Sequence, residues 1–150
     1  KTVAYLLGLE TAYVEKDRPD DSETPKFSKI VGDVREKRCL LIDDEILTGA
    51  TAIGDAEILK NEGAVSINML AVHPILRDKD LAQAELIKKF DGSSIERFIV
   101  TNSIPQNPGI LSSKFTVLSI APFLGEAIKR SILGQSLTEL HRLESVKIYQ

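Results

Sequence analysis

The sequence predicts an α/β domain with a mostly parallel sheet flanked by helices. Short apolar runs alternate with segments of helical periodicity, which is the pattern of repeated strand–helix–strand units. The strand candidates are continuous apolar runs, as expected for parallel strands that are buried on both faces. One run ends in two aspartates and a small, hydroxyl-rich turn (CLLIDDEILTGAT, residues 39–51), and ligands bind beyond such strand ends in parallel sheets.

The elements are expected in the order strand, helix, strand, helix, strand, strand, helix. Strands are predicted at residues 38–43, 65–72, 97–101 and 115–120. Helices are predicted at residues 51–61, 80–90 and 122–132, with a last short helix at 136–143. Upstream, residues 1–10 read as the end of a helix that stops near Gly8, and residues 11–15 and 30–34 as brief strands. Residues 16–28 have two prolines, three aspartates and two serines, which predicts an exposed, mobile loop.

Composition excludes several classes of protein. A chain of 150 residues suits one domain, and its net charge of −3 argues against a nucleic-acid partner. No run approaches the 18 apolar residues of a membrane span, and the start has no signal-peptide pattern. The single cysteine, Cys39, lies in an apolar run and is expected to be a buried, inert thiol, which fits a reducing, cytoplasmic compartment. Since the first helix lacks an initiating methionine and a cap, we expect the chain to begin inside a larger protein.

The candidate site is the end of the strand at Asp43 and Asp44 together with the turn at residues 48–51. A helix N-terminus leaves backbone N–H groups unpaired, and the threonine hydroxyls and Gly49 make the turn suited to a phosphate. Two carboxylates beside a phosphate are explained if the ligand also carries hydroxyl groups or Mg²⁺. The pattern therefore favours a sugar phosphate, and a helix-capping turn without any ligand is the alternative.

Apolar strand, Asp-Asp and Thr-Gly-x-Thr together resemble the ribose-phosphate loop of type I phosphoribosyltransferases and of ribose-phosphate diphosphokinases (PRPP synthetases). Three further stretches resemble the kinase family. VEKDRP at residues 14–19 is similar to its Asp-Lys-Arg-Arg-Pro loop, and VTNSIP at residues 100–105 to its Val-Thr-Asn-Thr-Ile-Pro. Residues 117–140 resemble its Leu-Ser-Val-Ala-Pro-Leu-Leu-Ala-Glu-Ala-Ile-Arg-Arg segment, so the resemblance covers nearly the whole chain.

The resemblance implies a type I phosphoribosyltransferase-like domain over residues 1–150, as the C-terminal domain of a longer two-domain protein. It implies a ribose 5-phosphate site, with Asp43 and Asp44 on the ribose hydroxyls and, indirectly, on Mg²⁺. The residues that would wrap the 5-phosphate are Thr48, Gly49, Ala50 and Thr51. Lys16 and Arg18 would stabilise the β,γ-diphosphoryl group of ATP as catalytic residues. ATP itself would be bound largely by an N-terminal half. Because members of the family form oligomers, the resemblance also implies a homo-oligomer.

Departures from the family pattern keep three functions open. Leu47 replaces an aspartate or threonine, Asp17 replaces a second arginine, and His73 matches the family but is followed by Pro74 in place of a glycine. The first function is a ribose-phosphate diphosphokinase that makes PRPP and AMP for nucleotide biosynthesis. The second is a PRPP-using phosphoribosyltransferase, although no base-recognising hood is evident. The third is a non-catalytic regulatory homologue, which Leu47 and Asp17 favour and which Lys16 and Arg18 oppose.

Overall fold

The structure is a computed structural model that describes residues 2–17, 27–107 and 109–141. The chain divides into two compact units, which are described separately below. One unit combines residues 1–9 with 119–150, and the other spans residues 10–118.

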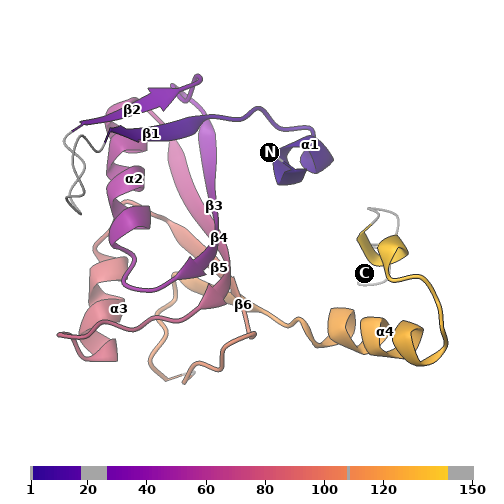
Figure 1. The fold of residues 1–150 in the computed structure, drawn as a ribbon. Helices are drawn as coiled ribbons and strands as arrows, with labels where there is room; N and C mark the ends of the chain where they lie inside the picture. The colour runs from indigo at the N-terminus through magenta and orange to yellow at the C-terminus, as the bar shows by residue number, and fades with distance from the viewer. Residues whose placement is uncertain (1, 18–26, 108, 142–150) are drawn as a thin grey trace. The chain divides into compact units, whose positions relative to one another are not determined.

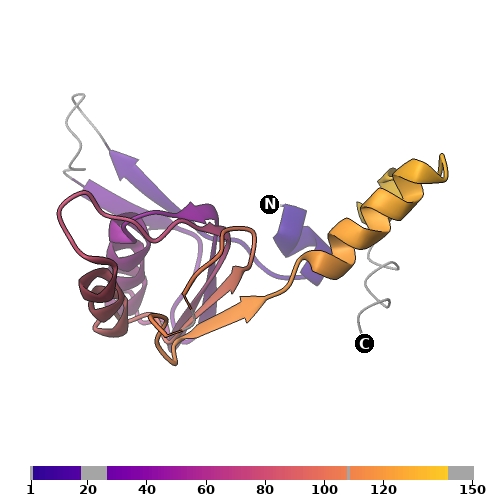
Figure 2. The same cartoon turned by 90° about the horizontal axis from the view of Figure 1, so that it is seen from below.

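The larger unit is built on a four-stranded parallel sheet in the order β3-β4-β5-β6 (Figure 1). The strands are β3 (Arg38–Ile46), β4 (Ser66–Pro74), β5 (Arg97–Thr101) and β6 (Phe115–Leu118). The connecting helices are α2 (Ala50–Asn61) and α3 (Gln83–Asp91), and both lie on one face of the sheet (Figure 2). Sequential strands that step in one direction through right-handed crossovers place their helices on the same side. The predicted α/β fold with a parallel sheet is confirmed.

The core of this unit lies between the sheet and the two helices. Side chains that alternate along β4, namely Ile67, Met69 and Ala71, are buried beneath the helices. At one end of this layer the rings of Phe90, Phe98 and Phe115 contact one another, with centroid distances of 4.9 to 5.7 Å. The opposite face of the sheet is less covered within this unit, as the half-exposed Ile42 (46%) and Leu118 (49%) illustrate.

Most predicted boundaries agree with the structure to within a few residues, and β5 agrees at both ends. Cys39 is half-buried rather than buried as predicted, and the burial that it has raises the pKa of its thiol. The described residues include no helix that is long and apolar enough to cross a membrane.

The expected loop at residues 16–28 is wrong at its two ends, and its residues 18–26 lie outside the described residues. Strands β1 (Tyr13–Asp17) and β2 (Phe27–Val31) pair antiparallel as a separate two-stranded sheet, so the predicted loop begins and ends inside strands. The brief strand expected at 30–34 therefore starts earlier. Main-chain hydrogen bonds between the two segments stabilise them as strands, which their polar composition does not predict.

The smaller unit carries α1 (Thr2–Leu7), α4 (Ala121–Ile132) and the 3₁₀ helix η1 (Thr138–His141). α1 ends at Leu7, next to Gly8, whose φ is 64°, and α4 has a proline in its first turn, as predicted. Arg130 joins α4 to η1, since its guanidinium donates to Glu126 at 2.9 Å and to Glu139 at 3.1 Å. This donation lowers the pKa of the Glu126 carboxyl.

Candidate functional site

The acidic segment belongs to β3 itself, which continues three residues beyond the predicted end at Asp43. The extension is held by pairing with β4, in which Glu45 lies opposite His73 and Ile46 opposite Pro74. Asp43 and Asp44 are therefore presented by a rigid strand end at the carboxyl edge of the sheet, where ligands of parallel α/β folds bind.

The two carboxylates begin from opposite faces of β3, because successive strand residues alternate. Asp43 lies opposite Ala71, which is fully buried beneath the helices. The Asp43 side chain therefore leaves the strand on the face of the sheet that α2 covers. Each aspartate accepts a hydrogen bond from the next N–H, Asp43 from Asp44 and Asp44 from Glu45, both at 3.0 Å. Both side chains are exposed and keep free lone pairs for a ligand.

The turn from β3 into α2 consists of Leu47, Thr48 and Gly49, so α2 starts at Ala50, one residue earlier than predicted. Gly49 has a φ of 71°, and its carbonyl accepts the first helical hydrogen bond, from Ile53 N–H at 2.9 Å. The N–H groups of the first turn of a helix have no intrahelical partner, which leaves that of the exposed Thr51 available to an anion. Thr48 supplies a hydroxyl that accepts from Ala50 N–H at 3.4 Å.

Space as well as φ requires glycine at this turn. A Cβ atom on Gly49 would lie 2.0 Å from Cε1 of Phe90, a ring that is itself fully buried. The turn is thereby pressed against the aromatic cluster of α3, β5 and β6. A backbone fixed in this way presents its N–H groups with little freedom, which suits the recognition of a phosphate.

Beside the acidic strand end lie polar side chains from β4, from the last residue of β5 and from the chain beyond β5. The hydroxyl groups of Thr101 and Ser103 both donate to the carbonyl of Val72, at 2.6 and 2.9 Å. Because the single hydroxyl hydrogen of Ser103 is used there, His73 Nδ1, 2.9 Å from the Ser103 oxygen, is assigned as the donor of that pair. This leaves His73 Nε2 as an acceptor.

Sequence reasoning noted His73 only through the family resemblance and did not include it among the site residues. The signal that could have identified His73 is its place at the carboxyl end of a predicted strand, because the carboxyl ends of adjacent parallel strands meet at one edge of the sheet.

The structure does not test the roles predicted for the two catalytic cations. Lys16 belongs to β1, where it pairs with Ser28, and Arg18 lies outside the described residues. No group of three or more His, Cys, Asp or Glu side chains that could hold a metal ion occurs in the described ranges. Asp43 and Asp44 do fit Mg²⁺ in another way, because this ion is commonly held by one or two carboxylates together with water and substrate phosphates.

The fold and the site together define a class. A parallel α/β sheet with acidic residues at one strand end, followed directly by the N-terminal turn of a helix, is the arrangement of a small-molecule-binding domain with an anion site. The chain belongs to the phosphoribosyl synthetase (PRPP synthetase) family, since the sequence profile described as the phosphoribosyl synthetase-associated domain matches residues 13–142. The predicted family is confirmed.

Curated relatives are ribose-phosphate pyrophosphokinases. The protein of Helicobacter hepaticus is 37% identical over 134 residues, and that of Wolinella succinogenes 34% over 134 residues. Ribose-phosphate pyrophosphokinase 5 of Schizosaccharomyces pombe is 35% identical over 139 residues. The alignments cover 89 to 93% of this chain but only 38 to 40% of these relatives, so the chain spans well under half of their length.

A solved structure gives the same result. The phosphoribosylpyrophosphate synthetase of Mycobacterium smegmatis superposes with a TM-score of 0.75 at 30% sequence identity. The match covers 89% of this chain and 40% of that protein. The fold of the family is therefore retained over most of the chain.

Proposed function

We propose that this chain is the ribose 5-phosphate-binding domain, and the C-terminal one, of a two-domain ribose-phosphate diphosphokinase. The observation that carries the proposal is the rigid end of β3, where Asp43 and Asp44 precede the glycine turn that opens α2. Acceptors for hydroxyl groups and donors for a phosphate thus lie a few residues apart, as a sugar phosphate requires. Family membership supports the same reading.

The 5-phosphate would bind at residues 48–51, where the hydroxyl groups of Thr48 and Thr51 add donors to the N–H groups of the first helical turn. Asp43, which starts on the same side of the sheet as this turn, would accept from a ribose hydroxyl. Asp44 starts from the other face and is better placed to meet a cation or a second hydroxyl. Mg²⁺ would neutralise the charge of the ATP phosphates when bound.

The reaction would be an in-line transfer in which the C1 hydroxyl oxygen of ribose 5-phosphate attacks the β-phosphorus of ATP. The bond between that phosphorus and the α,β-bridging oxygen breaks, AMP leaves, the C1 hydroxyl proton is released, and PRPP forms. Such a transfer depends on positioning and charge neutralisation, which Lys16 and Arg18 would supply. ATP would be held largely by sequence outside this chain, and the working protein would be a homo-oligomer.

A non-catalytic regulatory homologue is the second candidate, and Leu47 is the observation in its favour. Its side chain is 47% exposed in the turn beside the phosphate site, and it can donate no hydrogen bond there. A regulator that had lost affinity for the sugar would tolerate such a residue.

The test is ³¹P NMR of the complete gene product with ribose 5-phosphate, ATP and Mg²⁺. An active diphosphokinase produces AMP together with a 1-diphosphate sugar. Lys16→Ala is expected to lower the rate by about a hundredfold or more, because a cation that neutralises the transferred group is lost. Lys29→Ala is the matched control, since this exposed lysine lies opposite Glu15 on the partner strand, and it should retain wild-type activity.

The outcomes separate the candidates. Activity that survives Lys16→Ala contradicts the assigned role of Lys16. A wild-type protein that forms no PRPP contradicts the diphosphokinase and supports the regulatory homologue, whether or not it still binds ribose 5-phosphate.

A further inference from the structure

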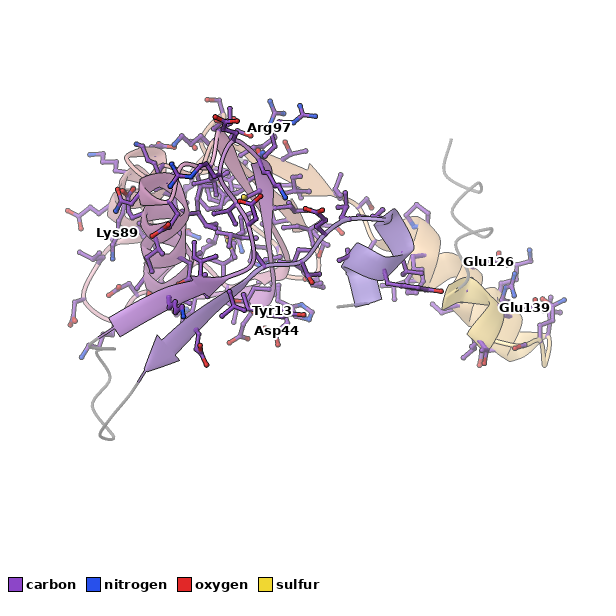
Figure 3. All side chains as sticks on the ribbon, turned by 90° about the horizontal axis from the view of Figure 1, so that it is seen from above. Tyr13, Asp44, Lys89, Arg97, Glu126 and Glu139 are labelled. Atoms are coloured by element: carbon purple, nitrogen blue, oxygen red, sulfur yellow. The ribbon has the colours of Figure 1, made fainter. Side chains whose placement is uncertain are left out.

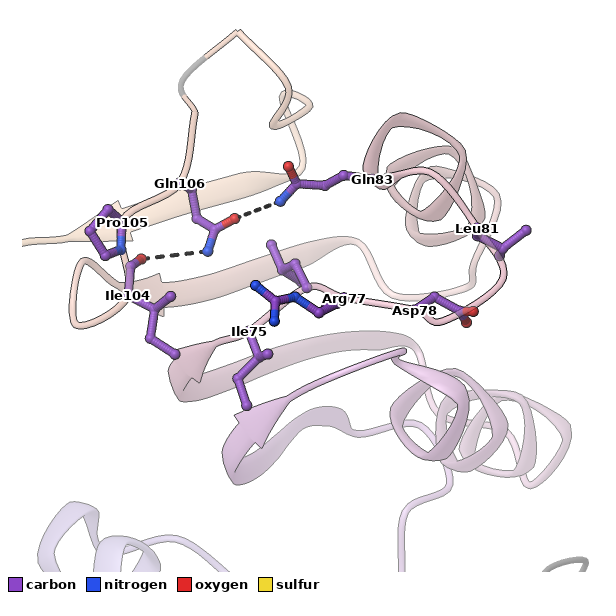
Figure 4. A pocket seen from close by; sticks show the side chains of 9 residues that line it. Ile75, Arg77, Asp78, Leu81, Gln83, Ile104, Pro105 and Gln106 are labelled. Atoms are coloured by element: carbon purple, nitrogen blue, oxygen red, sulfur yellow. Dashed lines mark hydrogen bonds between the residues drawn. The ribbon is translucent and has the colours of Figure 1, made fainter.

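A pocket lies at the carboxyl ends of β4 and β5 (Figure 4). It has a volume of about 300 Å³, and none of residues 48–51 lines it. Its walls come from residues 75–83, which lead into α3, and from residues 104–106, which follow β5. This volume is at the lower end of the range found for small-molecule sites in proteins.

The floor of the pocket depends on an unusual backbone at Leu76. Its φ is 46°, a left-handed value that costs a residue other than glycine about 1–2 kcal/mol. Leu76 N–H donates to the carbonyl of Ile46 at 3.0 Å, and Arg77 N–H to that of Leu47 at 3.1 Å. The chain beyond β4 is therefore tied to the end of β3, with Leu76 in the core (2% exposed) and Arg77 outside it.

The opposite wall is fixed by a pair of glutamines. Gln106 Nε2 donates to the carbonyl of Pro74 at 2.5 Å, and Gln106 Oε1 accepts from Gln83 Nε2 at 2.9 Å. Both side chains are half-buried. This bridge holds residues 104–106 against the start of α3, so the pocket has a defined shape before any ligand binds.

Arg77 is the cation of the pocket. Its side chain points into the same space as those of Ile104 and Gln106 (Figure 4). Within residues 2–17, 27–107 and 109–141, no carboxylate, carbonyl or hydroxyl group accepts a hydrogen bond from its guanidinium. The nearby Asp78 instead accepts from the N–H of Asp80 at 2.9 Å, which fixes the turn behind Arg77. A guanidinium with this freedom is suited to a planar, bidentate contact with a carboxylate or a phosphate.

We propose that this pocket is a separate binding site for a small organic anion. Its carboxylate or phosphate group pairs with Arg77, and its apolar body lies against Ile104 and Pro105. The polar edge of that body meets the amide groups of Gln83 and Gln106. This site differs from the sugar-phosphate site in its lining, which combines the Arg77 guanidinium and two glutamine amides with the apolar side chains of Ile104 and Pro105.

The test uses phenyl phosphate and benzoate as probes, with benzyl alcohol as the neutral match. Each is titrated into the ¹⁵N-labelled chain, and the Arg77 Nε–Hε signal and the amides of residues 75–83 and 104–106 are followed. At least one anion should shift these signals in a saturable way, and benzyl alcohol should bind about tenfold more weakly or worse. Whichever anion binds more tightly identifies phosphate or carboxylate as the group that the site takes.

Matched variants decide whether Arg77 is responsible. Arg77→Gln should weaken the tighter-binding probe about tenfold or more, and Arg77→Lys should weaken it less, since the charge remains. Arg97→Gln should leave affinity unchanged, because this exposed arginine begins β5, at the opposite end of the sheet from Asp44 (Figure 3).

Three results overturn the proposal: no saturable binding to the wild type up to about 10 mM probe, equal affinity in Arg77→Gln, or displacement of the probe by ribose 5-phosphate. The last would mean that the probe occupies the sugar-phosphate site. None of these results depends on whether the protein makes PRPP.

Discussion

Two connections leave the carboxyl edge of the sheet, and each of them places one residue at a left-handed φ. The residue is different in the two connections. The turn from β3 into α2 uses Gly49 at a φ of 71°, whereas the path from β4 toward α3 uses Leu76 at a φ of 46°. At Gly49 the Phe90 ring leaves no room for a side chain. At Leu76 the side chain is buried, so packing outweighs the strain of the backbone.

The difference separates two kinds of site. A glycine turn exposes bare N–H groups, which can approach a phosphate closely. A left-handed leucine instead anchors the chain in the core and leaves the next residue, Arg77, free at the surface. Under the two proposals, the first connection would recognise an anion with its backbone, whereas the second presents a side-chain cation. Substitutions at the left-handed residues test this comparison directly.

The largest effect is expected for Gly49→Ala. The new Cβ would overlap the Phe90 ring and would hold alanine at a strained φ, so the free energy of unfolding should fall by about 3 kcal/mol or more. For a domain of 150 residues this corresponds to a Tm lower by about 10 °C in thermal unfolding followed by circular dichroism.

Gly54→Ala is the control for this substitution, because Gly54 lies in the middle of α2 and a Cβ there would meet no atom within 4 Å. It should raise stability by about 0.5–1 kcal/mol, since alanine is the better helix former. An unchanged Tm for Gly49→Ala would show that the Phe90 ring can move to accommodate a Cβ atom, so that steric exclusion is not the reason for glycine at this turn.

A smaller effect is the difference in stability that we expect between two substitutions at Leu76, which separates the contribution of packing from that of backbone strain. Leu76→Ala should cost about 3 kcal/mol, because a buried side chain is lost. Leu76→Gly loses the same side chain but relieves the left-handed backbone, so it should be about 0.5–1 kcal/mol more stable than Leu76→Ala. Chemical denaturation of both variants measures the difference. If the glycine variant were the less stable of the two, strain at this position would be negligible and the contrast with Gly49 would disappear.

These two residues also show what the sequence could predict. Thr-Gly-x-Thr after an apolar run is a recognisable pattern, so a turn that opens a helix next to Gly49 can be predicted from local chemistry alone. The left-handed Leu76 has no such signal, because its conformation follows from hydrogen bonds to Ile46 and Leu47, some thirty positions earlier in the chain. The pocket lined by Arg77 and Gln106 was missed for the same reason.

Pairing explains the errors in strand length as well. β5 was predicted at both ends because its apolar residues are bounded by polar ones. β3 extends to Ile46 although the strand was predicted to end at Asp43, since Glu45 pairs with His73 and Ile46 with Pro74 on β4. Local composition identifies which segments can form strands, but ladder pairing decides where the strands end.

The smallest effect, and the sharpest test of backbone strain alone, is expected at Glu36. This exposed residue also has a positive φ, of 61°, in the turn before β3, where its N–H donates to the carbonyl of Gly63 at 2.8 Å. Because no buried side chain is lost, Glu36→Gly should raise the free energy of unfolding by about 0.5–1 kcal/mol. Glu62→Gly is the matched control, since Glu62 is equally exposed but has a φ of −81° at the end of α2, and it should lower stability by up to about 1 kcal/mol. If chemical denaturation shows that Glu36→Gly raises the free energy of unfolding and Glu62→Gly lowers it, the difference measures the cost of the left-handed backbone. If both variants change the free energy of unfolding in the same direction, a left-handed φ by itself carries no measurable cost.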